Sequence, residues 1–179
     1  TNLWVELGLQ TADAQSAAFI RRGYPLSVFT QAVYALAERN IPVVVHIILG
    51  LPGESRETVL RTIDYLNRLP IQGVKLQLLH VLSDSDLADL YRAGEYTPLE
   101  KEEYLTLVGD CIAHLRADIV LHRLTGDGDK NTLLAPLWSL RKRDVLNHLH
   151  RYLRENHIRQ GMSCKIDLSV IYNKPKDVL

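Results

Sequence analysis

The sequence is poor in cysteine, the residue that cross-links small secreted proteins through disulfide bonds and often binds metal ions. Its 179 residues include only two cysteines, Cys111 and Cys164, and a single methionine. Neither cysteine belongs to a C-x-x-C pattern or has a histidine at metal-ligand spacing, which argues against a disulfide framework and a cysteine-based metal site. Two isolated thiols are typical of a reducing compartment, so we expect a cytoplasmic protein.

An excess of one charge and long apolar runs are also lacking. The 21 basic and 21 acidic residues cancel, so net charge gives no reason to expect nucleic acid or an acidic membrane as a partner. No apolar run reaches the ~20 residues that span a bilayer, and no signal peptide precedes the first predicted strand. Because the chain opens on "TNLWVELGLQT", already within a strand, we expect a fragment of a longer protein.

Apolar residues change repeatedly between strand-like and helix-like spacing. The segment 42–49 is apolar almost throughout, as in a strand covered on both faces, whereas Val59, Ile63 and Leu66 share one helical face. Strands are predicted at 3–11, 42–49, 73–82 and 118–124, and helices at 27–39, 55–69, 84–94, 100–115 and 143–155. This alternation with short connections predicts a parallel α/β sheet or barrel.

Polar residues at the predicted carboxyl ends of the strands are the first candidates for a site, because ligands of parallel α/β folds bind there. This rule selects Gln10, His46 with residues 50–54, and Gln77 with His80. In "HIILGLPGES" (46–55), Gly50 and Gly53 allow a sharp turn or the close approach of a ligand. Each feature also has an ordinary explanation, since βα turns use glycine and a buried histidine is more often a hydrogen-bonded structural residue.

Several motifs follow one another in a specific order: "ELGLQT", "RRGY", "HIILGLPGE", "KLQLLHVL", "HRLTGDG" and "PLWSLRKRDVLNHL". Together they resemble the second half of a radical S-adenosylmethionine (SAM) domain. Within that superfamily the chain resembles an uncharacterised bacterial family of Fe–S oxidoreductases, related to the elongator catalytic subunit and oxygen-independent coproporphyrinogen oxidase. The resemblance spans about residues 3–161, and its most specific part is the spacing of Gln10, Arg22 and the Gly50 turn.

The resemblance implies an α/β fold that consists of the later strands and helices of a partial (β/α) barrel of the radical SAM type, with a C-terminal helical extension. It divides the chain into the second half of the barrel (1–116), a C-terminal extension (117–161) and a tail of uncertain structure (162–179). Within the tail, "KIDLSVIY" is an open candidate for a further strand.

The resemblance also implies a set of SAM contacts. Gln10 matches a polar residue that meets SAM in coproporphyrinogen oxidase, and Arg22 matches that enzyme's arginine for the SAM carboxylate, for which a guanidinium fork is suited. His46 stands where that enzyme has an aspartate that contacts the ribose. The sequence departs from the family here, although an imidazole can also donate or accept a hydrogen bond at this position. The adenine is expected against Ile48, Gly50, Leu51 and Pro52.

The reaction of the superfamily requires a [4Fe–4S] cluster held by C-x-x-x-C-x-x-C, which this sequence does not contain. The resemblance places that motif upstream of Thr1. It therefore implies a full-length enzyme that cleaves SAM reductively to a 5′-deoxyadenosyl radical, in which this chain supplies part of the SAM site and is inactive alone.

Two other functions remain open at this stage. One is a non-catalytic α/β module that binds a protein or RNA, and the other is a conventional barrel enzyme that uses the turn 50–53 for phosphate. The expected partners of the radical SAM enzyme are the N-terminal half of the same protein and an unknown substrate, with tRNA and a small metabolite as candidates and no membrane. The edge of the first strand is expected to be exposed, which favours either self-association through that edge or its coverage by "KIDLSVIY".

Overall fold

A computed structural model describes residues 3–126 and 128–166. The elements follow in the order β1 (Val5–Gln10), α1 (Ala14–Phe19), α2 (Leu26–Ala37), β2 (Val43–Leu49), α3 (Arg56–Leu66), β3 (Gly73–Leu78), β4 (Val81–Leu82), α4 (Asp86–Arg92), α5 (Lys101–His114), β5 (Val120–Arg123), β6 (Leu133–Ala135), the 3-10 helix η1 (Leu137–Leu140) and α6 (Lys142–Glu155). The segment "KIDLSVIY", an open candidate for a strand, lies almost wholly outside the described residues. No helix of the described part is long and apolar enough to cross a membrane.

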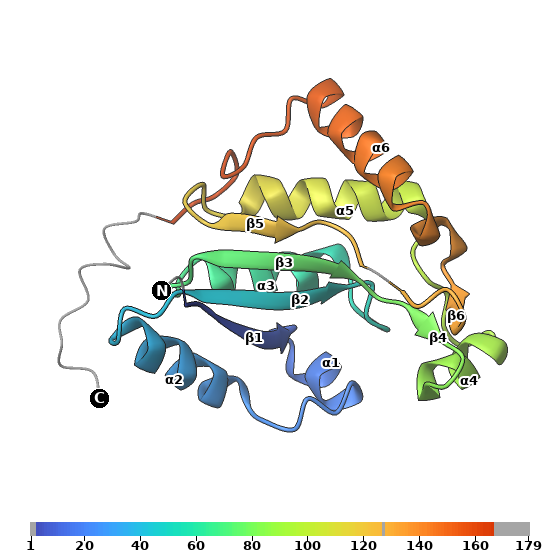
Figure 1. The fold of residues 1–179 in the computed structure, drawn as a ribbon, viewed down its shortest axis with the longest axis horizontal. Helices are drawn as coiled ribbons and strands as arrows, with labels where there is room; N and C mark the ends of the chain where they lie inside the picture. Colours follow the sequence, from blue (N-terminus) through green and yellow to red (C-terminus); the bar gives the residue numbers. More distant parts are fainter. Residues whose placement is uncertain (1–2, 127, 167–179) are drawn as a thin grey trace.

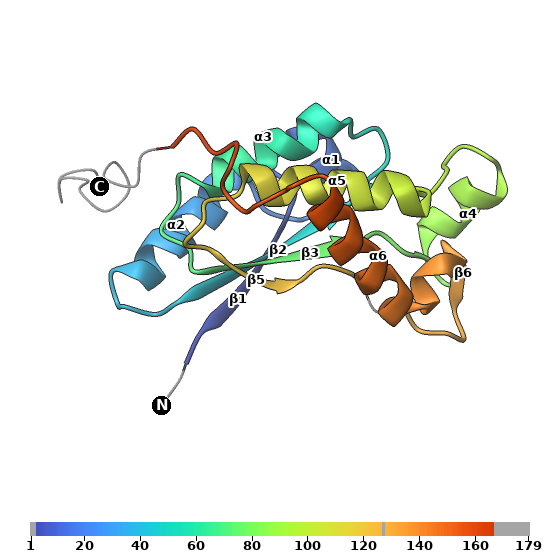
Figure 2. The ribbon, with the colours of Figure 1, turned by 90° about the horizontal axis from the view of Figure 1, so that it is seen from above.

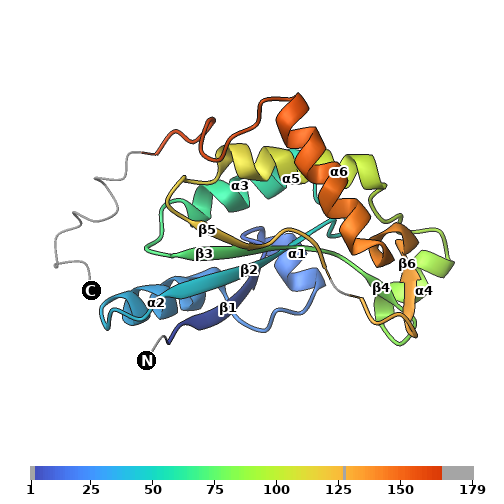
Figure 3. The same cartoon turned by 45° about the horizontal axis from the view of Figure 1, so that its top comes forward.

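The main sheet confirms the predicted parallel α/β fold. Its strand order is β1-β2-β3-β5, and each neighbouring pair is parallel (Figure 1). The sheet curves as part of a barrel but does not close, so β1 pairs only with β2 among the described residues. β4 and β6 form a separate antiparallel pair, which lies with α4 beyond the carboxyl ends of the main strands (Figure 3).

The prediction of one continuous strand over 73–82 is wrong in its second half. β3 ends at Leu78, and the Leu79 amide donates to the Leu49 carbonyl at 3.0 Å. The chain then leaves the sheet, and Val81 pairs with Ala135 of β6. Sequence periodicity did not show this break because both segments are apolar. It also missed α1, β6 and η1, which are too short to display a period.

The two faces of the sheet differ in chemistry. Val43, Val45, Ile47 and Leu49 of β2 are buried under the helices, because alternate side chains of a strand point to one face. Figure 2 shows α2, α3 and α5 on that face and no described helix on the other. The second face, called the open face below, carries the intervening residues of each strand, including His46 of β2 and Lys75 of β3. The apolar core therefore lies between the sheet and its helices.

A buried arginine, Arg116, links several chain segments at the end of the sheet where the parallel strands begin. The Arg116 side chain is 1% exposed and forms an ion pair with Asp118 at 3.0 Å. Its Nη1 donates to the main-chain carbonyls of Asn67 at 2.8 Å and Leu69 at 3.3 Å, just after α3. Gln160 in turn donates to the Arg116 carbonyl at 2.7 Å. The Arg116 guanidinium thus joins the segment after α3 to the segment after α5, and the Arg116 main chain holds the chain beyond α6.

We expect Arg116→Met to lower the free energy of unfolding by about 3 kcal/mol, because it leaves buried carbonyls without a donor. Urea denaturation of the 179-residue chain measures this change. Arg39→Met is the matched control, since the Arg39 guanidinium donates to a carbonyl on the exposed surface and its loss should change stability by less than about 0.5 kcal/mol. Equal losses in the two variants would contradict a central role for Arg116.

Candidate functional site

The connector after α1 holds the carboxyl end of β1. Arg22 Nη1 donates to the carbonyls of Leu9 at 3.2 Å and Thr11 at 2.6 Å, and its Nε donates to the Tyr24 carbonyl at 3.1 Å. The Tyr24 hydroxyl donates to the Gly8 carbonyl, and the Arg22 guanidinium lies 5.2 Å from the centre of the Tyr24 ring. Arg22 therefore returns to the end of β1 instead of pointing away into solvent.

Gln10 closes β1 in an unusual backbone conformation. Its φ is +65°, and the pairing of β1 with β2 shifts register between Gly8 and Gln10. The side chain folds back along the strand, so that a Cβ placed on Gly8 would lie 2.7 Å from Gln10 Nε2. A side chain at position 8 would therefore displace the amide end of the flexible Gln10 side chain. The turn of the backbone thus presents the Gln10 amide beside the open face.

His46 is the centre of a polar cluster on the open face. Its Nε2 lies 2.7 Å from Glu6 Oε2, and its Nδ1 lies 2.9 Å from Gln77 Nε2. The Lys75 ammonium contacts both Glu6 carboxylate oxygens at 2.6 Å. An amide nitrogen only donates, so with Gln77 in this orientation His46 Nδ1 accepts and Nε2 carries the proton toward Glu6. His46 is therefore oriented from both sides and does not pack under a helix.

Charge in this cluster favours the ionised carboxylate. The hydrogen bond from Lys75, and then the one from His46, lower the pKa of Glu6 from 4.5 to about 2. The three side chains are 38% (Glu6), 23% (His46) and 15% (Lys75) exposed in this chain. The open face thus offers a fixed anion, a cation and an imidazole to whatever lies against it.

A half-buried carboxylate, that of Glu54, connects the end of β1 to the turn after β2. The Thr11 hydroxyl donates to Glu54 Oε1 at 2.5 Å, and burial raises the pKa of Glu54. Ser55, the next residue, caps α3 by accepting from the Thr58 amide at 3.3 Å. The segment "PGES" is therefore held at both sides, which fixes the turn that precedes α3.

Packing explains why position 50 is glycine, which could not be predicted from the sequence. Its φ is +92°, and a Cβ at this position would lie 3.2 Å from the Leu99 side chain. The Gly50 carbonyl accepts from the Tyr96 hydroxyl at 2.8 Å. Glycine is thus needed for both the backbone conformation and the close approach of Leu99. The predicted contact of Gly50 with a flat ring stays a prediction.

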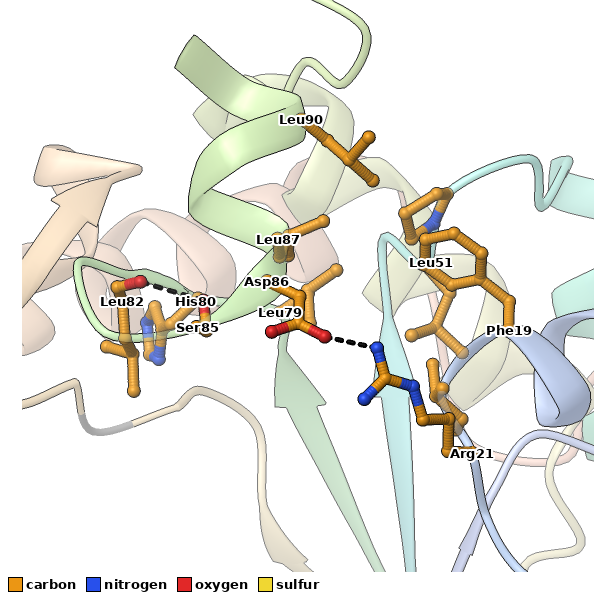
Figure 4. Close-up of a pocket in the computed structure, with 12 residues that line it drawn as sticks. Phe19, Arg21, Leu51, Leu79, His80, Leu82, Ser85, Asp86, Leu87 and Leu90 are labelled. Carbon is orange, nitrogen blue, oxygen red and sulfur yellow. Dashed lines mark hydrogen bonds and ion pairs between the residues drawn. The ribbon is translucent and has the colours of Figure 1, made fainter. Parts of the chain in front are cut away.

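Leu51 and Pro52 line a cavity of about 510 Å³ at the carboxyl ends of the strands (Figure 4). The cavity lies between the end of α1 and the start of α4. The other lining residues are Phe19, Ile20, Arg21, Leu79, His80, Leu82, Ser85, Asp86, Leu87 and Leu90. Gln10, Arg22 and His46 do not belong to this lining, so the predicted site residues divide between the cavity and the region of β1 and the open face. Ile48 follows His46 by two residues and shares the open face.

Sequence reasoning missed Glu6 and Lys75, although a signal for them was present. In "VELGLQ" and "GVKLQL", polar residues alternate with apolar ones that enter the core. A strand read at period two would have placed Glu6 and Lys75 on the same face as His46. Asp127, in the motif "HRLTGDG", lies outside the described residues.

The described residues do not fit an iron–sulfur cluster. No group of three or more His, Cys, Asp or Glu side chains in the described ranges is arranged to hold a metal ion. Cys111 is fully buried in α5, and burial raises the pKa of its thiol, whereas Cys164 is half-buried beyond α6. The arrangement at β1 and β2 instead suits an organic ligand with polar groups.

Comparison with known families gives two matches along the chain. The model of the radical SAM superfamily matches residues 2–66, and that of the radical SAM C-terminal domain matches residues 71–155. The chain is 35% identical to the uncharacterized protein YtqA of Bacillus subtilis over 161 residues, which cover 90% of this chain and 50% of YtqA. It is 33% identical to the Escherichia coli protein YhcC over 156 residues, which cover 87% of this chain and 50% of YhcC.

The fold has a counterpart among solved structures. The archaeal Methanocaldococcus infernus Elp3 with an N-terminal deletion superimposes with a TM-score of 0.76 at 18% identity, covering 88% of this chain and 37% of that one. At this identity the likeness is one of fold. The chain spans about half the length of the curated relatives it matches.

We expect the ionisation of Glu6 to depend on Lys75. The Glu6 carboxylate stabilises the folded chain above its ordinary pKa of 4.5, and this contribution is lost as the pH falls toward about 2. NMR titration of the Glu6 carboxyl carbon should therefore give a midpoint near 2, and Lys75→Met should move it toward 4.5. Arg39→Met serves as a control for loss of a distant charge. An unchanged midpoint in Lys75→Met would show that Lys75 does not pair with Glu6 in solution.

Proposed function

Because this chain belongs to the radical SAM superfamily, we propose that it supplies the carboxyl-terminal part of the SAM site of a larger radical SAM enzyme. The observation that supports this proposal is the placement of Arg22 and Gln10 together at the carboxyl end of β1, next to the open face that carries His46. When bound, SAM and a [4Fe–4S] cluster supply reductive cleavage of the sulfonium carbon–sulfur bond, which is the reaction we propose for the full-length protein.

Arg22 is proposed to bind the carboxylate of SAM. Main-chain carbonyls accept hydrogen bonds from its Nε and Nη1, and these bonds fix the plane of the guanidinium. Nη2 forms no hydrogen bond with the described residues and is the group that would donate to a carboxylate oxygen. A guanidinium already fixed in place loses little side-chain freedom on binding. The same contacts that stabilise the end of β1 therefore prepare Arg22 for an anion.

Gln10 and His46 are proposed to contact the polar groups of the bound SAM. The Gln10 amide offers both a donor and an acceptor, and the backbone at φ +65° directs it back over β1. His46 is half-buried and is oriented by Glu6 and Gln77, which suits a hydrogen bond to a ribose hydroxyl. Since both imidazole nitrogens have partners in this chain, a ribose hydroxyl would share or replace the contact with Glu6.

The apolar residues after His46 are proposed to lie against the adenine. Ile48 is half-buried on the open face, and Leu51 and Pro52 belong to the turn that Glu54 and Ser55 hold. Main-chain groups of the Gly50 segment are candidates for contacts with the adenine edge. Burial of a flat apolar surface against such residues is the usual source of affinity in cofactor sites.

The cluster ligands are proposed to lie in the part of the protein that precedes this chain. The described cysteines do not fit a cluster, and the chain spans half the length of its relatives. Among the described residues β1 pairs with β2 alone, and we propose that earlier strands of the same protein pair with its outer edge. The barrel would then extend across the open face and enclose the site.

The 179-residue chain should take up no four-iron cluster. Anaerobic reconstitution with iron and sulfide, followed by elemental analysis, measures this, and the full-length protein treated in parallel is the positive control. The physical reason is that only Cys111 and Cys164 are present, one of them fully buried. Stoichiometric incorporation of a [4Fe–4S] cluster into the 179-residue chain would refute the proposed division of the site.

In the full-length protein, Arg22→Ala should weaken SAM binding by about 1.5–3 kcal/mol, the usual contribution of a charged hydrogen bond. Iron content should not change. Tyr24→Phe is the matched control, because it removes the other side-chain tie to β1, at the Gly8 carbonyl, and keeps the guanidinium. Equilibrium binding of SAM to the three reconstituted proteins makes the comparison. Equal affinities of wild type and Arg22→Ala would remove Arg22 from the site.

A further inference from the structure

The cavity between α1 and α4 is largely apolar and is bridged at its mouth by one ion pair. Its walls are formed mainly by leucine side chains with Phe19 and Pro52, and about 510 Å³ is a suitable volume for a small organic molecule. Arg21 from the α1 side and Asp86 from the α4 side form the ion pair (Figure 4). Their side chains are 79% and 78% exposed, so water screens the pair and it contributes little to stability.

Arg21 occupies a position for which its own backbone is poorly suited. α1 ends with Arg21 N donating to the Ala18 carbonyl and Arg22 N to the Ala17 carbonyl, both at 3.0 Å. This pattern is a Schellman cap, and its left-handed position is Arg21, with φ +53°. Glycine is the usual residue there, and Gly94 fills the same place after α4. The fold alone therefore favours glycine over arginine at position 21.

Asp86, by contrast, has a local reason to be where it is. It is the first residue of α4 and follows the N-cap residue Ser85. A carboxylate in the first turn of a helix interacts favourably with the amide groups exposed there. Asn40 after α2 and His157 after α6 hold the same left-handed position, and Arg21 differs from them in lining the cavity.

The consecutive residues Arg21 and Arg22 make different contacts. Arg22 is fixed to the carbonyls at the end of β1, and Arg21, one residue earlier, is turned toward the cavity by its left-handed backbone. Arg21 has a partner that a ligand can replace, because an exposed ion pair exchanges readily. Among the described residues that line the cavity, Arg21 is the only arginine or lysine.

We propose that this cavity binds a substrate with an apolar body and an anionic end group, and that Arg21 recognises the carboxylate or phosphate in exchange for Asp86. The assignment to substrate rests on the proposed function, because Leu51 and Pro52 line this cavity and also belong to the expected SAM site. Binding of the apolar anion itself requires only residues of this chain. No bond is made or broken in this step.

Isothermal titration of the 179-residue chain with decanoate, decanol and decyltrimethylammonium, each below its micelle concentration, tests the proposal. Decanoate should bind about tenfold more tightly than the other two, as expected for one charged hydrogen bond. Arg21→Gly should reduce decanoate affinity to that of decanol and leave decanol binding unchanged. Asp86→Asn should raise decanoate affinity, because it removes the competing carboxylate.

Thermal unfolding separates this role of Arg21 from a structural one. Arg21→Gly should unfold at the same or a higher temperature than the wild type, since glycine suits the left-handed position. Methyl NMR shifts of Leu51, Leu87 and Leu90 on adding decanoate should confirm the place of binding. Equal affinity for the three probes, or unchanged decanoate binding in Arg21→Gly, would overturn the proposal.

A competition experiment distinguishes the substrate from SAM. In the full-length protein, decanoate should remain bound when S-adenosylhomocysteine is added, as followed by the Leu87 and Leu90 methyl shifts, and its displacement would overturn the assignment to substrate. These measurements use neither iron nor SAM, so their failure leaves the proposed radical SAM function standing. Conversely, loss of the Arg22 dependence of SAM binding in the full-length protein would leave the binding of an apolar anion by Arg21 standing.

Discussion

The alternation of side chains along the central strands is the constraint on which the rest of the structure depends. In β2, Val43, Val45, Ile47 and Leu49 must enter the core, so His46 has to face the other side. In β3 the same requirement directs Lys75 and Gln77 to that side. The polar cluster on the open face is thus a direct result of how the apolar residues pack. A shift of one residue in either strand would bury charges and expose the core.

The same contacts serve the fold and the proposed site. Arg22 stabilises the end of β1 through main-chain carbonyls, and Glu54 joins that end to the turn after β2. Neither interaction requires a ligand, yet both fix groups that a ligand would meet. Preorganisation of this kind lowers the conformational freedom lost on binding. Arg21 differs, because its exposed ion pair holds no element in the core and its backbone does not suit its side chain.

The sequence predicted those parts of the fold in which apolar residues recur regularly over a long segment. It predicted only those site residues that lie at the carboxyl ends of strands. The segment 42–49 and the helix after Ser55 were found because their patterns are strong. The break at Leu79 was not, since the chain stays apolar while it changes partner. The packing around Gly8 and Gly50 could not be predicted either, because the amide of Gln10 and the side chain of Leu99 come close only in three dimensions. The roles of Gln10, Arg22 and His46 toward SAM remain predictions.

The buried guanidinium of Arg116 makes the two ends of the molecule unequal in resistance to local opening. At the amino-terminal edge of the sheet, separating the segments after α3 and α5 exposes a desolvated charge and several carbonyls at once. At the opposite edge, α1 and α4 are bridged by an ion pair that water already screens. Amide hydrogen exchange would then follow a gradient along the strands, slowest near Asn67 and fastest around Arg21. Such a gradient would let the end of the sheet at which we propose ligands bind fluctuate, while the opposite end keeps the strands in register.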